Sequence, residues 1–174
     1  MRKTVPAVLM LFAMTVFVGA VTSEAREMPG KGKVAVKLSA VPKVKTKAGG
    51  GATFELAKDG AAIHYVLKAK DLENATMAHI HEVGEGGAPG AVVVWLYPTT
   101  GEAPSLKEGK TTGILAEGEI TADKLGGPMK GGTVKDLFEK IEYGKAGVAV
   151  HTKDNPGGEL WGFHKGKEPK KKMM

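Results

Sequence analysis

Three histidines give this sequence its most specific chemical pattern. His79 and His81 stand two residues apart, and His151 follows directly on a Val-Ala-Val segment. Because side chains alternate between the two faces of a strand, His79 and His81 project together while Ile80 projects the other way. The valines at 148 and 150 likewise share one face and leave His151 on the other. If Ile80 and these valines face one core, all three imidazoles lie on the outer face of two strands.

Neutral imidazole binds copper and zinc, so neighbouring strands of this kind predict a metal site formed by His79, His81 and His151. The alternative is that a His-x-His pair on a half-exposed strand is two polar residues facing water. His64 and His164 are candidate additional ligands, with a solvated strand position as the alternative for each. Glu159 is a candidate for orienting an imidazole through its second nitrogen, or for closing a turn by accepting backbone N–H bonds.

The composition and the charge pattern exclude several other kinds of site. The chain has no cysteine, which removes thiolate catalysis and cysteine-ligated zinc. The glycine-rich segment 84–90 lacks the lysine and hydroxyl of a phosphate-binding loop. The net charge is +6, but residues 26–164 carry only +1, whereas the tail 165–174 carries +4. We therefore expect no specific nucleic-acid partner, and a lysine tail that attracts anionic surfaces.

The ends of the chain differ from its middle. Arg2 and Lys3 precede an apolar stretch that is followed by small residues, so residues 1–25 are predicted to be a signal peptide. Residues 26–32 are predicted to be a flexible lead-in, 33–164 one domain and 165–174 a basic flexible tail. No later segment approaches the length of a transmembrane span. The protein is therefore expected to be exported, either to a periplasm or out of the cell.

Short alternating segments separated by turn residues indicate an all-β domain. Thr133 is the predicted N-cap of one short helix, in which apolar residues recur at helical spacing before Gly144. The core is expected to be aliphatic, with Trp95 among its few large aromatic members. Such a pattern predicts an antiparallel β-sandwich. The predicted strands cover residues 34–38, 52–56, 63–67, 77–83, 91–97, 114–120, 147–152 and 159–164.

Three segments together resemble the CHRD domain, in their order and spacing as well as in their residues. They are Ala78-His79-Ile80-His81, the GEITADKLGGP segment at 118–128, and Val150-His151-Thr152 with the NPGGE segment at 155–159. The resemblance covers about residues 33 to 164. It implies an immunoglobulin-like β-sandwich and an extracytoplasmic module without an established general activity. Trp161 and His164 depart from the family pattern, which usually has a basic or polar residue and an aliphatic one there.

The segment from His79 to Gly84 is also similar to the copper-ligand strand of copper–zinc superoxide dismutases, whose fold is likewise a sandwich. His151 would then take the place of the histidine on a later strand. The zinc-loop ligands, the disulfide and the C-terminal arginine of that family have no counterparts here. The sequence therefore favours a non-enzymatic binding module with a copper or zinc site. The alternatives are a structural domain with an unidentified protein partner and no metal, and a superoxide dismutase-like enzyme.

Overall fold

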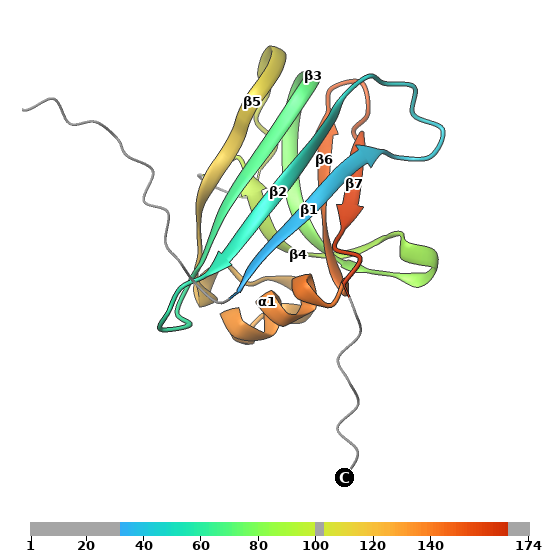
Figure 1. Ribbon diagram of the computed structural model, residues 1–174. Helices are drawn as coiled ribbons and strands as arrows, with labels where there is room; N and C mark the ends of the chain where they lie inside the picture. The colour runs from blue at the N-terminus through green and yellow to red at the C-terminus, as the bar shows by residue number, and fades with distance from the viewer. Residues whose placement is uncertain (1–31, 100–102, 167–174) are drawn as a thin grey trace, which may run out of the picture.

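A computed structural model describes residues 32–99 and 103–166 of the chain (Figure 1). The expected signal peptide, most of the lead-in and most of the tail lie outside the described residues. Within the described ranges all strand pairings are antiparallel and there is one α-helix, so the all-β prediction is confirmed. The strands are β1 (Lys33–Ala40), β2 (Gly49–Leu56), β3 (Ile63–Val83), β4 (Pro89–Tyr97), β5 (Lys107–Ile120), β6 (Ala146–Thr152) and β7 (Leu160–Phe163), and the helices are α1 (Val134–Glu142) and the short 3-10 turns η1 (Glu85–Gly87), η2 (Ala122–Lys124) and η3 (Gly127–Met129).

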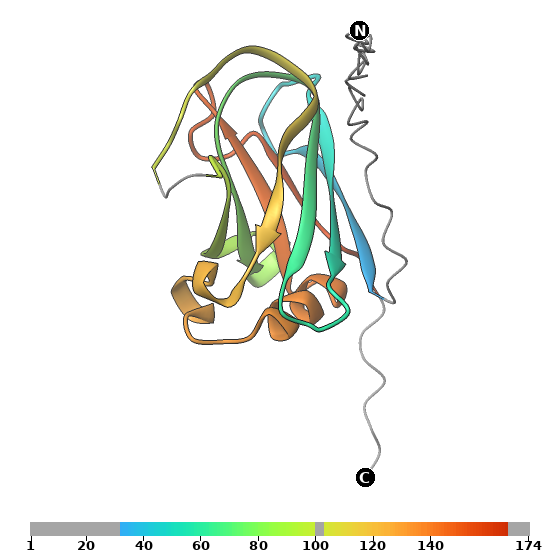
Figure 2. The same cartoon turned by 90° about the vertical axis from the view of Figure 1, so that its left-hand side faces the viewer.

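One continuous sheet closes on itself because the two halves of β3 pair with different strands of the circuit. The first half of β3 pairs with β2, and its second half pairs with β6. Since β1 joins β2 to β7, and β7 pairs with β6, these five strands form a closed circuit. β4 and β5 pair with β3 outside this circuit. Figures 1 and 2 show the strands wrapped around a common interior, which is a barrel with extra strands where the sequence predicted two stacked sheets.

The length of β3 explains this difference. The sequence predicted two strands, at 63–67 and 77–83, whereas the structure has one strand of 21 residues. Asp71 and Asn74 adopt left-handed backbone angles, with φ of 52° and 49°, which Asp and Asn tolerate better than most residues. The register of β3 against β5 shifts in the same stretch. Such bulges let a strand bend without ending, so one strand contributes to both sides of the barrel.

The core cluster is mainly aliphatic, with Phe54, Tyr65 and Phe138 as its aromatic members. Ile80, Val148 and Val150 are each at most 1% exposed and belong to the same core cluster. The residues that alternate with them therefore point out of the barrel, as the sequence indicated. The prediction that Trp95 belongs to the core is wrong. Trp95 stands between buried Val94 and Leu96, so strand alternation turns its indole away from the core cluster.

Helix α1 lies across one end of the barrel (Figure 1). The Thr133 hydroxyl accepts a hydrogen bond from the Asp136 backbone N–H at 3.1 Å, and the Asp136 carboxylate accepts one from the Thr133 N–H at 3.3 Å. This capping box fixes the start of the helix at the predicted position. The buried face of the helix consists of Val134, Leu137, Phe138 and Ile141. In the described part of the chain, no helix combines the length and the hydropathy needed to span a membrane.

Candidate metal centre

The pairing of β3 with β6 brings the three histidines together. Ala78 lies opposite Val150, and His79 lies opposite Ala149, which places His151 diagonally across from His79. The ring centroid of His79 is 5.0 Å from that of His151 and 5.5 Å from that of His81. One nitrogen from each of the three rings lies within 4.8 Å of the other two. Bonds of about 2 Å to a shared ion require nitrogens about 3.5 Å apart, so small ring rotations would suffice.

The three imidazoles lie outside the barrel but are shielded from water. His79 is 4% exposed, and His81 and His151 are each 8% exposed. Across the sheet, His79 stands between Trp95 of β4 and Ala149 of β6, and Ala149 stands opposite Trp161 of β7. The Trp95 ring meets His79 edge-on with centroids 4.2 Å apart, and Trp161 meets His81 edge-on at 6.0 Å. The two tryptophans therefore make a buried site where the sequence alone left a solvated strand face open as an alternative.

The indoles of Trp95 and Trp161 form a cover over the histidines, and small residues on β6 make room for it. Gly147 lies opposite His81, and a Cβ atom at this glycine would come within 2.8 Å of the Trp161 ring. The Trp161 indole is held by a hydrogen bond from its Nε1–H to the Gly87 carbonyl at 2.8 Å. The glycine-rich turn between β3 and β4 is thereby tied to β7, over the histidine face.

Backbone carbonyls set the orientation of two imidazoles. Nδ1 of His81 lies 2.9 Å from the Gly90 carbonyl oxygen, and Nδ1 of His151 lies 2.9 Å from the Pro156 carbonyl oxygen. A carbonyl can only accept, so each Nδ1 donates its N–H and each neutral ring keeps its lone pair on Nε2. Both Nε2 atoms are buried and have no hydrogen-bond partner among the residues that the structure describes. Histidine ligands of metals are commonly held through the outer nitrogen in this way.

His79 has no such anchor. Both of its ring nitrogens are buried, and within residues 32–99 and 103–166 neither has a hydrogen-bond partner. Leaving one buried polar atom unpaired costs about 1–3 kcal/mol. Orphaned polar atoms in a native interior call for a specific explanation, of which a bound ion is one.

The cluster holds its histidines in the neutral form. Burial, assisted by the nearby His151 and His81 rings, lowers the pKa of His79 from 6.5 to about 4. Burial also lowers the pKa of His81 and His151, and outweighs the opposite effect of their hydrogen bonds to Gly90 and Pro156. Neutral imidazoles can bind a metal without first losing a proton.

Glu159 supports the site indirectly, through the turn that contains Pro156. Its carboxylate is buried and accepts hydrogen bonds from the Thr46 hydroxyl at 2.7 Å, the Thr152 hydroxyl at 2.7 Å and the Asn155 amide at 2.9 Å. No hydrogen bond joins it to an imidazole among the described residues. Instead it fixes the turn that presents the Pro156 carbonyl to His151.

The structure does not bring His64 or His164 to this cluster. Nδ1 of His64 lies 3.1 Å from Oε1 of Glu119, and the His64 side chain is 43% exposed. Nδ1 of His164 lies 3.1 Å from the Ala35 carbonyl oxygen. Within residues 32–99 and 103–166, the trio at 79, 81 and 151 is the one group of histidine or acidic side chains close enough to hold an ion.

Sequence reasoning missed the residues that enclose the site. Strand alternation in β4 could have placed Trp95 beside the histidines, because it lies out of phase with Val94 and Leu96. Trp161 was visible only as a departure from the family pattern. The carbonyls of Gly90 and Pro156 left no signal in the sequence, because any residue supplies a carbonyl.

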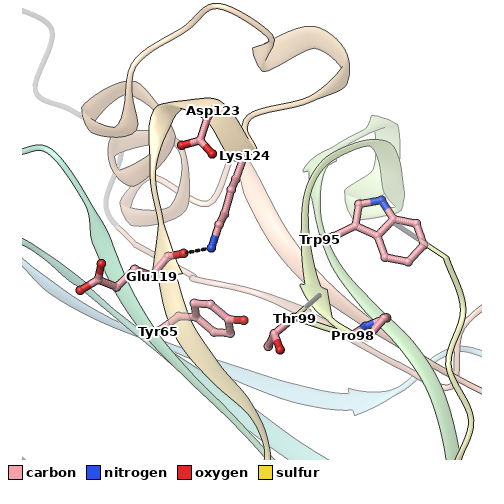
Figure 3. A pocket seen from close by; sticks show the side chains of 7 residues that line it. All are labelled: Tyr65, Trp95, Pro98, Thr99, Glu119, Asp123 and Lys124. Atoms are coloured by element: carbon pink, nitrogen blue, oxygen red, sulfur yellow. Dashed lines mark hydrogen bonds between the residues drawn. The ribbon is translucent and has the colours of Figure 1, made fainter. Parts of the chain in front are cut away.

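A separate cavity of about 210 Å³ lies beside the barrel, with its lining shown in Figure 3. In Figure 3 the Trp95 indole points away from Tyr65 and Glu119. The same ring contacts His79, with centroids 4.2 Å apart. The Tyr65 hydroxyl donates to the Leu96 carbonyl at 2.8 Å, and burial raises its pKa to about 12. The Lys124 ammonium donates to the Glu119 carbonyl at 2.7 Å. These polar groups are engaged in holding the walls together.

Comparison with known proteins identifies one family. The family model described as the CHRD domain matches residues 32–163. No match was found among curated proteins or among solved structures. The matched range contains both histidine-bearing strands, both covering tryptophans, and Gly90 and Pro156, whose carbonyls orient the rings. Because this match spans most of the chain, the protein belongs to the CHRD domain family.

Proposed function

We propose that this protein is an exported, non-enzymatic module that binds one copper or zinc ion through His79, His81 and His151. The observation that carries the proposal is the set of buried, unpartnered ring nitrogens: Nε2 of all three residues and Nδ1 of His79. One ion would engage a nitrogen from each ring. The short distances between these nitrogens and the neutral state of the rings support the same assignment.

The enclosure of the site favours binding over catalysis. A catalytic metal needs a coordination position that substrate or water can reach. Here the free ring nitrogens are buried, and the rings pack against Trp95 and Trp161 and are held by the carbonyls of Gly90 in β4 and Pro156 in a turn. For this reason we do not assign dismutase chemistry to the site.

Metal titration of the purified, metal-free protein tests the proposal. Calorimetry with Cu(II) or Zn(II) is expected to show about one equivalent bound, and His79→Ala should weaken binding at least tenfold. His64→Ala is the matched control, because His64 lies on the same strand and its imidazole stays outside the cluster. Equal affinity of the wild type and His79→Ala would overturn the proposal.

A structural domain without a metal is the second candidate, and the carbonyl bonds of His81 and His151 favour it. In that case His79→Ala lowers the melting temperature by the same amount with and without a chelator. If the metal assignment is right, a chelator lowers the melting temperature of the metal-loaded wild type and leaves that of His79→Ala unchanged.

Export is proposed from the charged and apolar pattern of residues 1–25. Mass spectrometry of the protein recovered outside the cytoplasm should find a mature chain that begins near Arg26. Recovery of the full-length chain only from the cytoplasm would contradict export and leave the metal assignment standing.

A further inference from the structure

Met77 extends the face that carries the three histidines. It is the direct cross-strand partner of His151, one residue before the Ala78↔Val150 pair. Ala78 and Val150 are both fully buried in the core, so Met77 and His151 both project to the opposite face. Directly opposed residues in an antiparallel pair have Cβ atoms about 5 Å apart. Met77 therefore lies beside His151 on the face that carries the imidazole cluster.

The cluster offers no negative charge to a bound ion. Its three members are neutral rings, and the two nearest candidate carboxylates in the sequence have other partners. Glu159 accepts three side-chain hydrogen bonds, and Glu82 accepts a bond from Lys140 at 2.9 Å. The electrostatic cost of burying an ion grows with the square of its charge, so a divalent ion costs about four times as much as a monovalent one. The neutral, buried setting favours a monovalent ion.

The number and type of ligands point the same way. Zinc sites have four protein ligands, or three and a position open to water. Here three imidazoles lie under a cover that excludes water, and the side chain beside them on the same face is a thioether. Thioether sulfur is a soft ligand that selects Cu(I).

We propose that this site binds Cu(I) in preference to Zn(II), with Met77 as a fourth ligand beside His79, His81 and His151. This inference rests on the proposed function and names its ion. The tryptophan cover keeps water from the ion, which suits retention of Cu(I).

The test compares two methionine variants of the full chain. Cu(I) affinity is measured anaerobically by competition with a chromophoric Cu(I) chelator, and Zn(II) affinity with a chromophoric zinc indicator. Met77→Leu keeps the approximate side-chain volume and removes the sulfur. Met129→Leu is the matched control, because Met129 is buried in η3 and belongs to the barrel core. Each titration runs until the signal is constant, since the ring nitrogens are buried.

The wild type should bind Cu(I) at least a hundredfold more tightly than Zn(II). Met77→Leu should weaken Cu(I) binding at least tenfold and change Zn(II) binding less than twofold, while Met129→Leu changes neither. Tighter binding of Zn(II), or a Met77→Leu variant that binds Cu(I) like the wild type or weakens both ions equally, overturns the Cu(I) inference. The proposed function survives those results if His79→Ala still loses the ion. Failure of the wild type to bind either ion defeats both.

Discussion

The two ends of β3 both carry histidines, and they differ in what surrounds them. His64 stands between Glu55 on β2 and Glu119 on β5, on a surface open to water. His79 stands between Trp95 and Ala149, in a site closed to water. The alternation of one strand turns histidines outward at both ends, so the strand neighbours decide whether the result is a solvated ion pair or a buried ligand cluster.

The two ends of β3 also differ in the free-energy cost of their buried polar atoms. At the open end, Nδ1 of His64 contacts the Glu119 carboxylate, and the side chain is partly exposed. At the closed end, several ring nitrogens are buried without partners, and each costs about 1–3 kcal/mol until something binds it. The closed end is therefore the place where a ligand would add the most stability.

Removing the buried carboxylate should have the largest effect. Glu159→Ala leaves Thr46, Thr152 and Asn155 without their acceptor and should lower the free energy of unfolding by about 3–4 kcal/mol. It should also weaken metal binding, because the turn that orients His151 loses its support. Urea unfolding and metal titration measure the two effects.

The matched change at the open end is Glu119→Ala, which removes the exposed partner of His64. It should change the free energy of unfolding by less than about 1 kcal/mol and leave the metal affinity unchanged. Similar losses of stability and metal affinity in Glu159→Ala and Glu119→Ala would contradict the difference between the two ends of β3.

The metal-free protein should lose stability in acid. The pKa of His79 is about 4 in the folded chain and about 6.5 in the unfolded chain, so the unfolded chain takes up the proton first as the pH falls. The stabilising contribution is complete above pH 6.5 and disappears as the pH falls to about 4, a loss of about 3 kcal/mol. Urea unfolding at a series of pH values measures it. His79→Leu, which cannot be protonated, should lose less over this window, and identical curves would contradict the assignment.

The sequence predicted the face on which the histidines lie, because strand alternation is a local property. Ile80 and the valines of β6 turned inward and the imidazoles turned outward, as expected from their spacing. The helix start was also predictable, since the cap and its partner are three residues apart. Local patterns of this kind survive into the fold.

The enclosure of the site could not be predicted, because it depends on contacts between segments far apart in the chain. Trp161 reaches the Gly87 carbonyl, and Glu159 reaches Thr46. The closure of the barrel was missed for a related reason: left-handed backbone angles at Asp71 and Asn74 let one strand continue where the composition suggested an interruption.

Loosening the cover formed by Trp161 should have a much smaller effect than removing Glu159. Trp161→Phe keeps an aromatic ring beside His81 and removes the hydrogen bond to the Gly87 carbonyl. The free energy of unfolding should fall by about 1 kcal/mol. Hydrogen exchange at the amides of residues 84–90 should become faster, whereas exchange around His64 should not change. Unchanged exchange in that turn would show that the indole does not hold the cover in place.

In the proposed metal centre, three imidazoles from two strands share one ion. Anomalous diffraction at the copper edge, from crystals grown with the metal-loaded protein, tests this arrangement most directly. One strong peak in contact with His79, His81 and His151 is expected. A peak at His64 and Glu119, or no peak between the three rings, would contradict the arrangement.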